Sequence, residues 1–186
     1  MFLKVKIPHA RIKVMNVFII ASVSADGFIA RFNDVDGSST DWTSREDTRF
    51  FVRKTKEAGV IVMGYSTYKT IPEKFCPLKD RLNLVYTRKD LKSKLDNLRY
   101  VNSSPKELID SLEKEGHKNI AICGGRSIYS MFMEAGVVDK LYLTVESIVF
   151  GKGVSLFDKE LDIKLKLVKS ENLSDQTILL EYDVIR

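Results

Sequence analysis

The stretch NIAICGGRSIYSMFMEAG, residues 119–136, contains the pattern that decides the fold class. Residues 119–123 predict a short buried strand, Gly124 and Gly125 a sharp turn, and residues 127–135 a helix that Gly136 ends. A strand, a glycine turn and a helix in this order let a phosphate approach backbone N–H groups at the start of the helix. A glycine pair at such a junction is also common as a packing turn, so the stretch by itself leaves both interpretations open.

Outward from this stretch, strands and helices alternate along the chain. Expected strands cover residues 17–23, 60–63, 82–86, 98–101, 141–147, 165–170 and 177–184, and expected helices start near residues 44, 66 and 104. This alternation predicts an α/β fold with a mostly parallel central sheet covered on both faces and an antiparallel C-terminal hairpin. Ligands bind such sheets at the carboxyl ends of the strands.

Composition and charge narrow the functional class. The chain has 186 residues, 44% hydrophobic and 30% charged, which predicts one globular domain over residues 15–186. The longest apolar run has about seven residues, so we expect no membrane span. Cys76 and Cys123 predict free thiols in a reducing, cytoplasmic compartment. The two histidines have no carboxylate or cysteine at ligand spacing, so we expect no metal site.

The net charge of +5 is concentrated at the N-terminus. Residues 1–14 have four basic and no acidic side chains, which leaves +1 for residues 15–186. A nucleic-acid-binding body shows a basic face, so we expect no nucleic-acid partner. The basic extension over residues 1–14 is interpreted as a start-site extension or tail, with contact to an anionic surface as the alternative.

A second group of polar residues begins where a polar loop over residues 33–41, the candidate lid, ends. Trp42, the one tryptophan, follows this loop, and Ser44 with Asp47 resembles a capping box that starts a helix. Asp47 there either stabilises the helix dipole or, beside apolar Phe50 and Phe51, has a raised pKa and supplies a proton. Both interpretations stay open at this point.

Four motifs together resemble those of the dihydrofolate reductase superfamily, which includes the reductase domain of the riboflavin-biosynthesis protein RibD. SADGFIA (24–30) is similar to the SxDGxIA start of the riboflavin group, and VMGYSTY (62–68) to the MGRxTY cofactor segment. Gly124-Gly125 with Ile128-Tyr129, followed by LYLT (141–144), resembles the GG…IY…LYLT signature of dihydrofolate reductases. The resemblance covers Met15 to Arg186 and implies a dihydrofolate-reductase-like three-layer α/β/α sandwich.

The resemblance also implies NADPH-dependent reduction of a small-molecule substrate and assigns roles to single residues. Asp47 matches the acid that assists protonation, and Thr144 the threonine that contacts it. The positions implied to bind cofactor are Gly64, Thr67, Thr87, Arg88, Gly124, Gly125, Ile128 and Tyr129. Those implied to bind substrate are Trp42, Phe51 and Arg81.

Two departures from the family pattern bear on specificity. Tyr65 stands where dihydrofolate reductases usually have an arginine for the 2′-phosphate of NADPH, and the Asp-Asp-Pro segment of riboflavin reductases is missing. The leading hypothesis is a reductase of 5-amino-6-(5-phosphoribosylamino)uracil, favoured by Asp26-Gly27. Dihydrofolate reductase activity and nucleotide binding without turnover are the alternatives. Riboflavin-type relatives imply a homodimer, which would cover the apolar strand 177–184 if it is an exposed edge.

Overall fold

The structure is a computed structural model that describes residues 15–33 and 41–186. The basic extension, residues 1–14, and most of the expected lid, residues 34–40, lie outside the described residues. The predictions made for these two segments therefore stay predictions.

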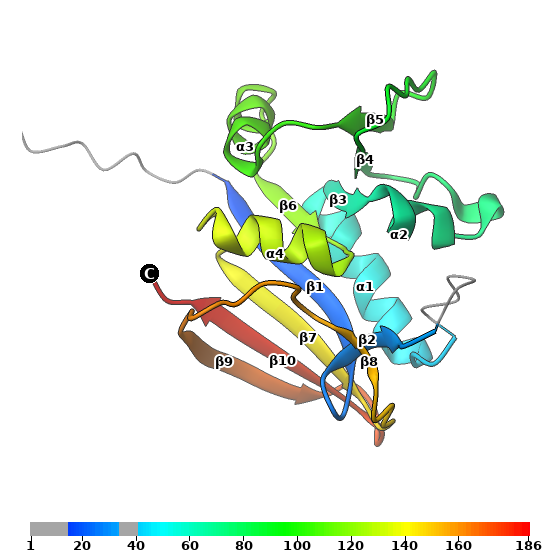
Figure 1. Ribbon diagram of the computed structural model, residues 1–186, viewed down its shortest axis with the longest axis vertical. Helices are drawn as coiled ribbons and strands as arrows, with labels where there is room; N and C mark the ends of the chain where they lie inside the picture. Colours follow the sequence, from blue (N-terminus) through cyan, green and yellow to red (C-terminus); the bar gives the residue numbers. More distant parts are fainter. Residues whose placement is uncertain (1–14, 34–40) are drawn as a thin grey trace, which may run out of the picture.

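The core of the fold is an eight-stranded sheet with the strand order β5-β4-β3-β6-β1-β7-β10-β9 (Figure 1). Its strands are β1 (Asn16–Ser24), β3 (Val60–Gly64), β4 (Leu82–Tyr86), β5 (Leu98–Val101), β6 (Asn119–Ile122), β7 (Lys140–Glu146), β9 (Leu165–Asn172) and β10 (Thr177–Val184). The strands from β5 to β7 pair in parallel, and β10 runs antiparallel to both β7 and β9. The predicted mixed sheet is confirmed.

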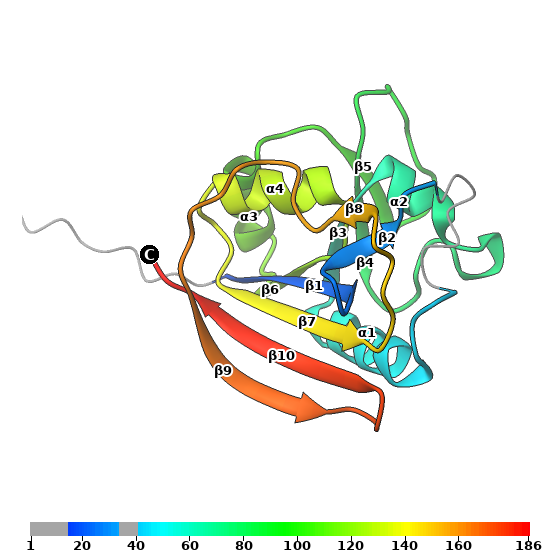
Figure 2. The same cartoon turned by 60° about the horizontal axis from the view of Figure 1, so that its bottom comes forward.

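Helices cover both faces of this sheet, because the central strand β1 presents apolar side chains on both of its faces. Val17, Ile19 and Ala21 pack with α3 (Pro105–Lys114) and α4 (Arg126–Glu134). Phe18 and Ile20 pack on the opposite face with Phe50 of α1 (Arg45–Ala58). Figure 2 shows α3 and α4 on one side of the sheet and α1 on the other. The short α2 (Tyr65–Thr70) and the 3₁₀ turn η1 (Glu73–Phe75) follow β3. The three-layer α/β/α sandwich is therefore confirmed.

The starts of the helices only partly follow the predicted caps. Ser104 and Glu107 form both bonds of a capping box at α3. At α1, the N–H of Asp47 donates to Ser44 Oγ at 3.1 Å, but the N–H of Ser44 donates to Oε1 of Glu146 at 2.9 Å. The predicted capping box at α1 is therefore wrong in one half, and the Asp47 carboxyl is available for other contacts.

Two short strands were not predicted. β2 (Phe28–Arg31) and β8 (Gly153–Ser155) form a small antiparallel sheet of their own. Asp26 connects the turn before β2 to the loop before β8, because its carboxylate accepts hydrogen bonds from the N–H groups of Phe150 and Gly151 at 2.7–3.2 Å. Ser24 Oγ donates to the same carboxylate at 2.6 Å.

The edge of the main sheet also differs from the prediction. β10 lies between β7 and β9, so Thr177–Val184 is an interior strand and Leu179 is buried. The edge strand is β9, in which Leu165, Leu167 and Val168 are exposed. The prediction of β10 as an exposed edge was wrong, because β7 pairs with one of its edges and β9 with the other.

Candidate active site

Most of the predicted site residues follow the carboxyl ends of neighbouring parallel strands. In sheet order these are Thr87 after β4, Gly64 at the end of β3, Gly124 after β6, and Thr144 near the end of β7. Adjacent strands lie about 4.8 Å apart, so the row from β4 to β7 extends over roughly 19 Å. This row, along one edge of the sheet, is the candidate active site.

Asp47 and Thr144 meet at the β7 end of the row. Thr144 Oγ1 donates to Oδ1 of Asp47 at 2.5 Å, and the same hydroxyl oxygen lies 3.0 Å from Oγ of Ser22 on β1. Asp47 is 8% exposed and Thr144 is 2% exposed. The structure thus brings together the two residues to which the resemblance gave catalytic roles, in surroundings largely closed to water.

Burial raises the pKa of the Asp47 carboxyl above its usual value of 3.8. Hydrogen bonds from Ser22, Thr144 and Thr43 oppose this rise, whereas the nearby charge of Glu146 adds to it. A carboxyl with a raised pKa holds a proton at higher pH than a solvated one. The burial and the raised pKa of Asp47 are compatible with proton donation, and its catalytic role stays a prediction.

Several polar residues around Asp47 were missed in the sequence. Glu146 is 5% exposed, and its carboxylate accepts from the N–H and Oγ of Ser44 and from Oγ1 of Thr177, each at 2.9 Å. Ser22 gave a usable signal, because it is the one polar residue inside the apolar run 17–23. Glu146 and Thr177 gave none, because a polar residue at a strand end usually faces solvent.

Trp42 and Phe51 lie near the start of α1. The Trp42 ring packs edge-on against Phe150, with ring centroids 5.1 Å apart. Its indole N–H is buried and has no hydrogen-bond acceptor in the described part of the chain. A buried donor without an acceptor is costly, so this N–H is suited to an acceptor on a bound molecule. Phe51 is half-buried and packs on the same side of the sheet as Phe50.

The two glycine junctions form one compact cradle. The N–H of Gly64 donates to the carbonyl of Gly124 at 2.7 Å, which joins the end of β3 to the turn before α4. The Gly124–Gly125 peptide is cis, and Gly124 has φ +125°. A Cβ on Gly125 would lie 3.1 Å from Oγ1 of Thr67. No side chain caps α4, whose N-cap is Gly125, so its first backbone N–H groups are open to a ligand.

Ile128 and Tyr129 support this cradle from α4. A Cβ on Gly64 would lie 3.2 Å from the Ile128 side chain. The Tyr129 hydroxyl donates to the carbonyl of Ile20 at 3.0 Å and lies beside Gly124. Both residues thus hold the walls of the cradle in place.

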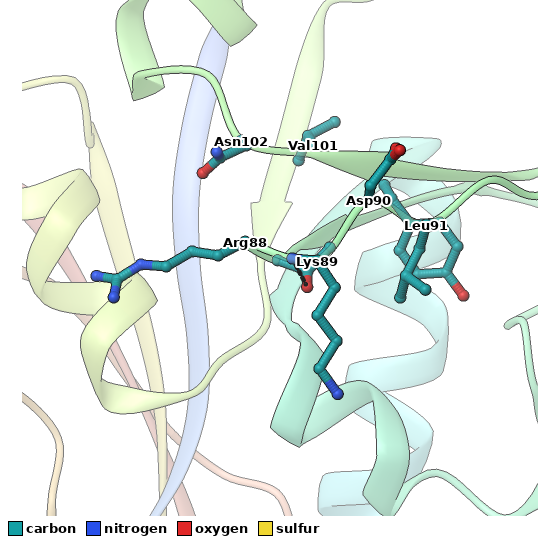
Figure 3. Close-up of a pocket in the computed structure, with 8 residues that line it drawn as sticks. Arg88, Lys89, Asp90, Leu91, Val101 and Asn102 are labelled. Carbon is teal, nitrogen blue, oxygen red and sulfur yellow. Dashed lines mark hydrogen bonds between the residues drawn. The ribbon is translucent and has the colours of Figure 1, made fainter.

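A cavity of about 320 Å³ lies at the far end of the row, beyond β4 (Figure 3). It is lined by Thr87, Arg88, Lys89, Asp90, Leu91, Tyr100, Val101 and Asn102. Arg88 and Lys89 extend in different directions from the loop after β4. Lys89 Nζ lies 4.9 Å from the ring centroid of Tyr65, which in turn packs against Tyr100. A cation therefore covers the position where the family has its arginine.

Arg81 stands apart from this row. It precedes β4, whereas Thr87 follows it, so the two backbone positions lie at opposite ends of the strand. Its side chain is buried, and the guanidinium donates to the carbonyl of Lys79 and to Oγ1 of Thr55 on α1. The structure does not bring Arg81 together with Asp47, and its role in substrate binding stays a prediction.

Two features are absent from the described residues, 15–33 and 41–186. These residues contain no group of three or more histidine, cysteine or acidic side chains that could hold a metal ion. None of their helices has the length and apolar character needed to cross a membrane.

Comparisons with known proteins agree with this geometry. A family model described as dihydrofolate reductase matches residues 16–177. The dihydrofolate reductase of Aedes albopictus is 27% identical over 164 residues, which cover 83% of this chain and 84% of that enzyme. A putative riboflavin biosynthesis protein from Shewanella sp. PV-4 superposes with a TM-score of 0.76 at 21% identity, covering 92% of this chain and all of that one.

A second solved structure shares the fold over part of its length. It is a diaminohydroxyphosphoribosylaminopyrimidine deaminase/5-amino-6-(5-phosphoribosylamino)uracil reductase from Thermotoga maritima. The TM-score is 0.74 at 18% identity, and the match covers 93% of this chain but 57% of that one. At these identities the two solved structures establish the likeness of the fold.

Proposed function

The chain belongs to the dihydrofolate reductase family, and from this premise we propose that it is an NADPH-dependent reductase of a pyrimidine or pterin. The observation that carries the proposal is the buried contact between Asp47 and Thr144 at the end of a row of glycine junctions. A buried acid in the same row of strand ends as the glycine cradle and the uncapped start of α4 suits hydride transfer better than binding alone.

The residues present fit a dinucleotide. The cradle is closely packed, since a Cβ on Gly64 or on Gly125 would lie 3.2 or 3.1 Å from a neighbouring side chain, and the uncapped N–H groups at the start of α4 suit a phosphate. Arg88 and Lys89 at the cavity beyond β4 would hold the 2′-phosphate of NADPH. When bound, NADPH supplies a hydride.

The chain itself supplies the proton and the orientation. Reduction of a C=N bond leaves negative charge on nitrogen unless a proton arrives there. Asp47 is the proposed donor, because burial raises its pKa and Thr144 fixes the direction of its carboxyl. The buried N–H of Trp42 would donate to an acceptor on the substrate ring. Both contacts hold the ring in one orientation, which lowers the entropic part of the barrier.

For the substrate, we put the riboflavin-pathway compound 5-amino-6-(5-phosphoribosylamino)uracil first. The likeness of the fold to the Shewanella and Thermotoga proteins supports this choice. Dihydrofolate is the second candidate, supported by the match to the Aedes enzyme along most of both chains. We place the protein in the cytoplasm as a homodimer with residues 15–186 as one domain. Its two free cysteines suit a reducing compartment.

The test measures oxidation of NADPH and of NADH with each of the two substrates. Turnover of the aminouracil with NADPH supports the first candidate, and turnover of dihydrofolate supports the second. Asp47→Asn is the matched control, because it keeps the shape of the side chain and removes the acid. Tight NADPH binding without turnover of either substrate would instead identify a non-catalytic nucleotide-binding protein.

A further inference from the structure

A buried carboxylate that the proposed mechanism does not use lies close to Asp47. We propose that Glu146 is a positioning residue for Asp47, which anchors the first turn of α1 through Ser44 and places a second negative charge beside the Asp47 carboxyl. The catalytic meaning of this inference rests on the proposed function. The contacts of Glu146 and its effect on Asp47 are properties of the protein itself.

The anchoring half follows from the contacts of the Glu146 carboxylate. Its Oε1 accepts from both the backbone N–H and the Oγ of Ser44, and its Oε2 accepts from Oγ1 of Thr177 on β10. Three donors point at a side chain that is 5% exposed. Hydrogen bonds to an ionised acceptor are stronger than neutral ones, so they hold the start of α1 firmly on β7.

The anchor reaches Asp47 by two routes. Ser44 Oγ accepts from the backbone N–H of Asp47 at 3.1 Å, which fixes the main chain. Thr144 donates to Oδ1 of Asp47 and lies two residues before Glu146 on β7. Side chains two apart on a strand lie on the same face, so Thr144 and Glu146 hold one helix turn from adjacent positions.

The electrostatic half follows from the groups that face Asp47. β1 contributes Ser22, the segment before α1 contributes Thr43, and β7 contributes Thr144 and Glu146. From α4, Tyr129 is buried, which holds the pKa of its hydroxyl well above the usual range, so it is neutral. Of these groups, Glu146 is the one whose charge raises the pKa of Asp47. A like charge nearby disfavours the ionised form of Asp47 and favours the form that can give a proton.

The experiment compares Glu146→Gln with Glu181→Gln. Glutamine keeps the shape and an acceptor for Ser44 but removes the charge. Glu181 is a carboxylate on β10 that pairs with Lys140 at the opposite end of β7, so its replacement controls for a general loss of charge. The readout is the pKa of Asp47, measured by carboxyl-carbon NMR in the protein without ligands.

We expect Glu146→Gln to lower the measured pKa of Asp47 by about one pH unit, and Glu181→Gln to leave it unchanged. An unchanged Asp47 pKa in folded Glu146→Gln would overturn the electrostatic half. Ser44→Ala tests the anchoring half and remains informative if Glu146→Gln does not fold. It removes the acceptor of the Asp47 N–H, so exchange of that amide with solvent should become at least tenfold faster. An unchanged exchange rate would overturn the anchor.

A kinetic measurement separates this inference from the proposed function. If the protein is a reductase, the pH profile of single-turnover hydride transfer should move to lower pH in Glu146→Gln, in step with the Asp47 pKa. If no substrate is reduced by the wild type, the proposed function fails, and the NMR result still decides the role of Glu146.

Discussion

Thr144 Oγ1 lies 2.5 Å from Oδ1 of Asp47, although the two residues are 97 positions apart in the chain. The contact joins the first turn of α1 to β7, the last strand of the row, and both residues are buried. A hydroxyl that donates to a buried carboxyl fixes the direction in which that carboxyl can give a proton.

Asp47→Asn tests the proton donor. The asparagine keeps an acceptor for Thr144 but has no proton to give, so the hydride step should slow by about 10²–10⁴-fold. NADPH affinity should change little, because Asp47 is not part of the glycine cradle. Single-turnover rates and cofactor titration measure the two effects separately. Turnover at the wild-type rate would reduce Asp47 to a helix-stabilising charge.

The raised pKa of Asp47 predicts that the stability of the folded protein depends on pH, and Asp47→Asn tests this. Because burial raises the pKa of Asp47 above 3.8, the folded protein binds its proton more tightly than the unfolded chain does. The contribution of Asp47 to stability is therefore present at pH below 3.8 and is lost as pH rises through the folded-state pKa. Asp47→Asn should lack this loss and melt higher than the wild type near pH 7. A lower Tm for the variant at neutral pH would contradict the raised pKa.

Arg88→Ala and Lys89→Ala test whether these side chains bind the 2′-phosphate of NADPH. Each should weaken NADPH binding by about 1.5–3 kcal/mol, the range for hydrogen bonds to charged groups, and leave NADH binding nearly unchanged. Lys114→Ala on α3 is the control for a general loss of positive charge. Calorimetric titration with both nucleotides gives the numbers, and equal losses for NADPH and NADH would remove these residues from the role.

Gly125→Ala tests the cradle. The new Cβ would lie 3.1 Å from Oγ1 of Thr67, a contact tighter than side chains normally make. We expect NADPH binding to be lost while circular dichroism still shows a folded protein, because Gly125 has φ −84° and tolerates an L residue. An alanine variant with normal NADPH affinity would mean that the junction has a packing role alone.

Assembly is tested at the edge strand β9. Its exposed side chains include Leu165, Leu167 and Val168, which a homodimer would cover. Leu167→Lys should then shift the protein toward the monomer in light scattering, with little change in Tm. A wild type that is monomeric at micromolar concentration would count against the dimer.

The sequence predicted the frame of the fold well because buried parallel strands are short apolar runs between turn residues. Strands 82–86, 98–101 and 177–184 were predicted with their exact bounds. β2 and β8 were missed because they are short, four and three residues, and contain no buried side chain, so no apolar pattern marks them. The hairpin of β9 and β10 was predicted, but the edge was misassigned because the pairing of β10 with β7 joins segments far apart in the chain, which no local pattern encodes.

The site was predicted unevenly for a similar reason. Asp47, Thr144 and the glycines came from motifs in the sequence, but the partners of Glu146 lie 102 and 31 positions away from it. The absence of arginine at Tyr65 was visible in the sequence. The cation that replaces it, Lys89, became apparent only when the structure placed its Nζ over the Tyr65 ring.

The contacts of Asp26 change what the SADG motif says about chemistry. Both oxygens of its carboxylate accept hydrogen bonds from Ser24 and from the loop before β8, and these bonds lower its pKa. The motif thus joins two loops by hydrogen bonds, and both carboxylate oxygens of Asp26 are engaged in them rather than with a substrate. A change of substrate preference should therefore leave the motif intact while altering the surroundings of Trp42.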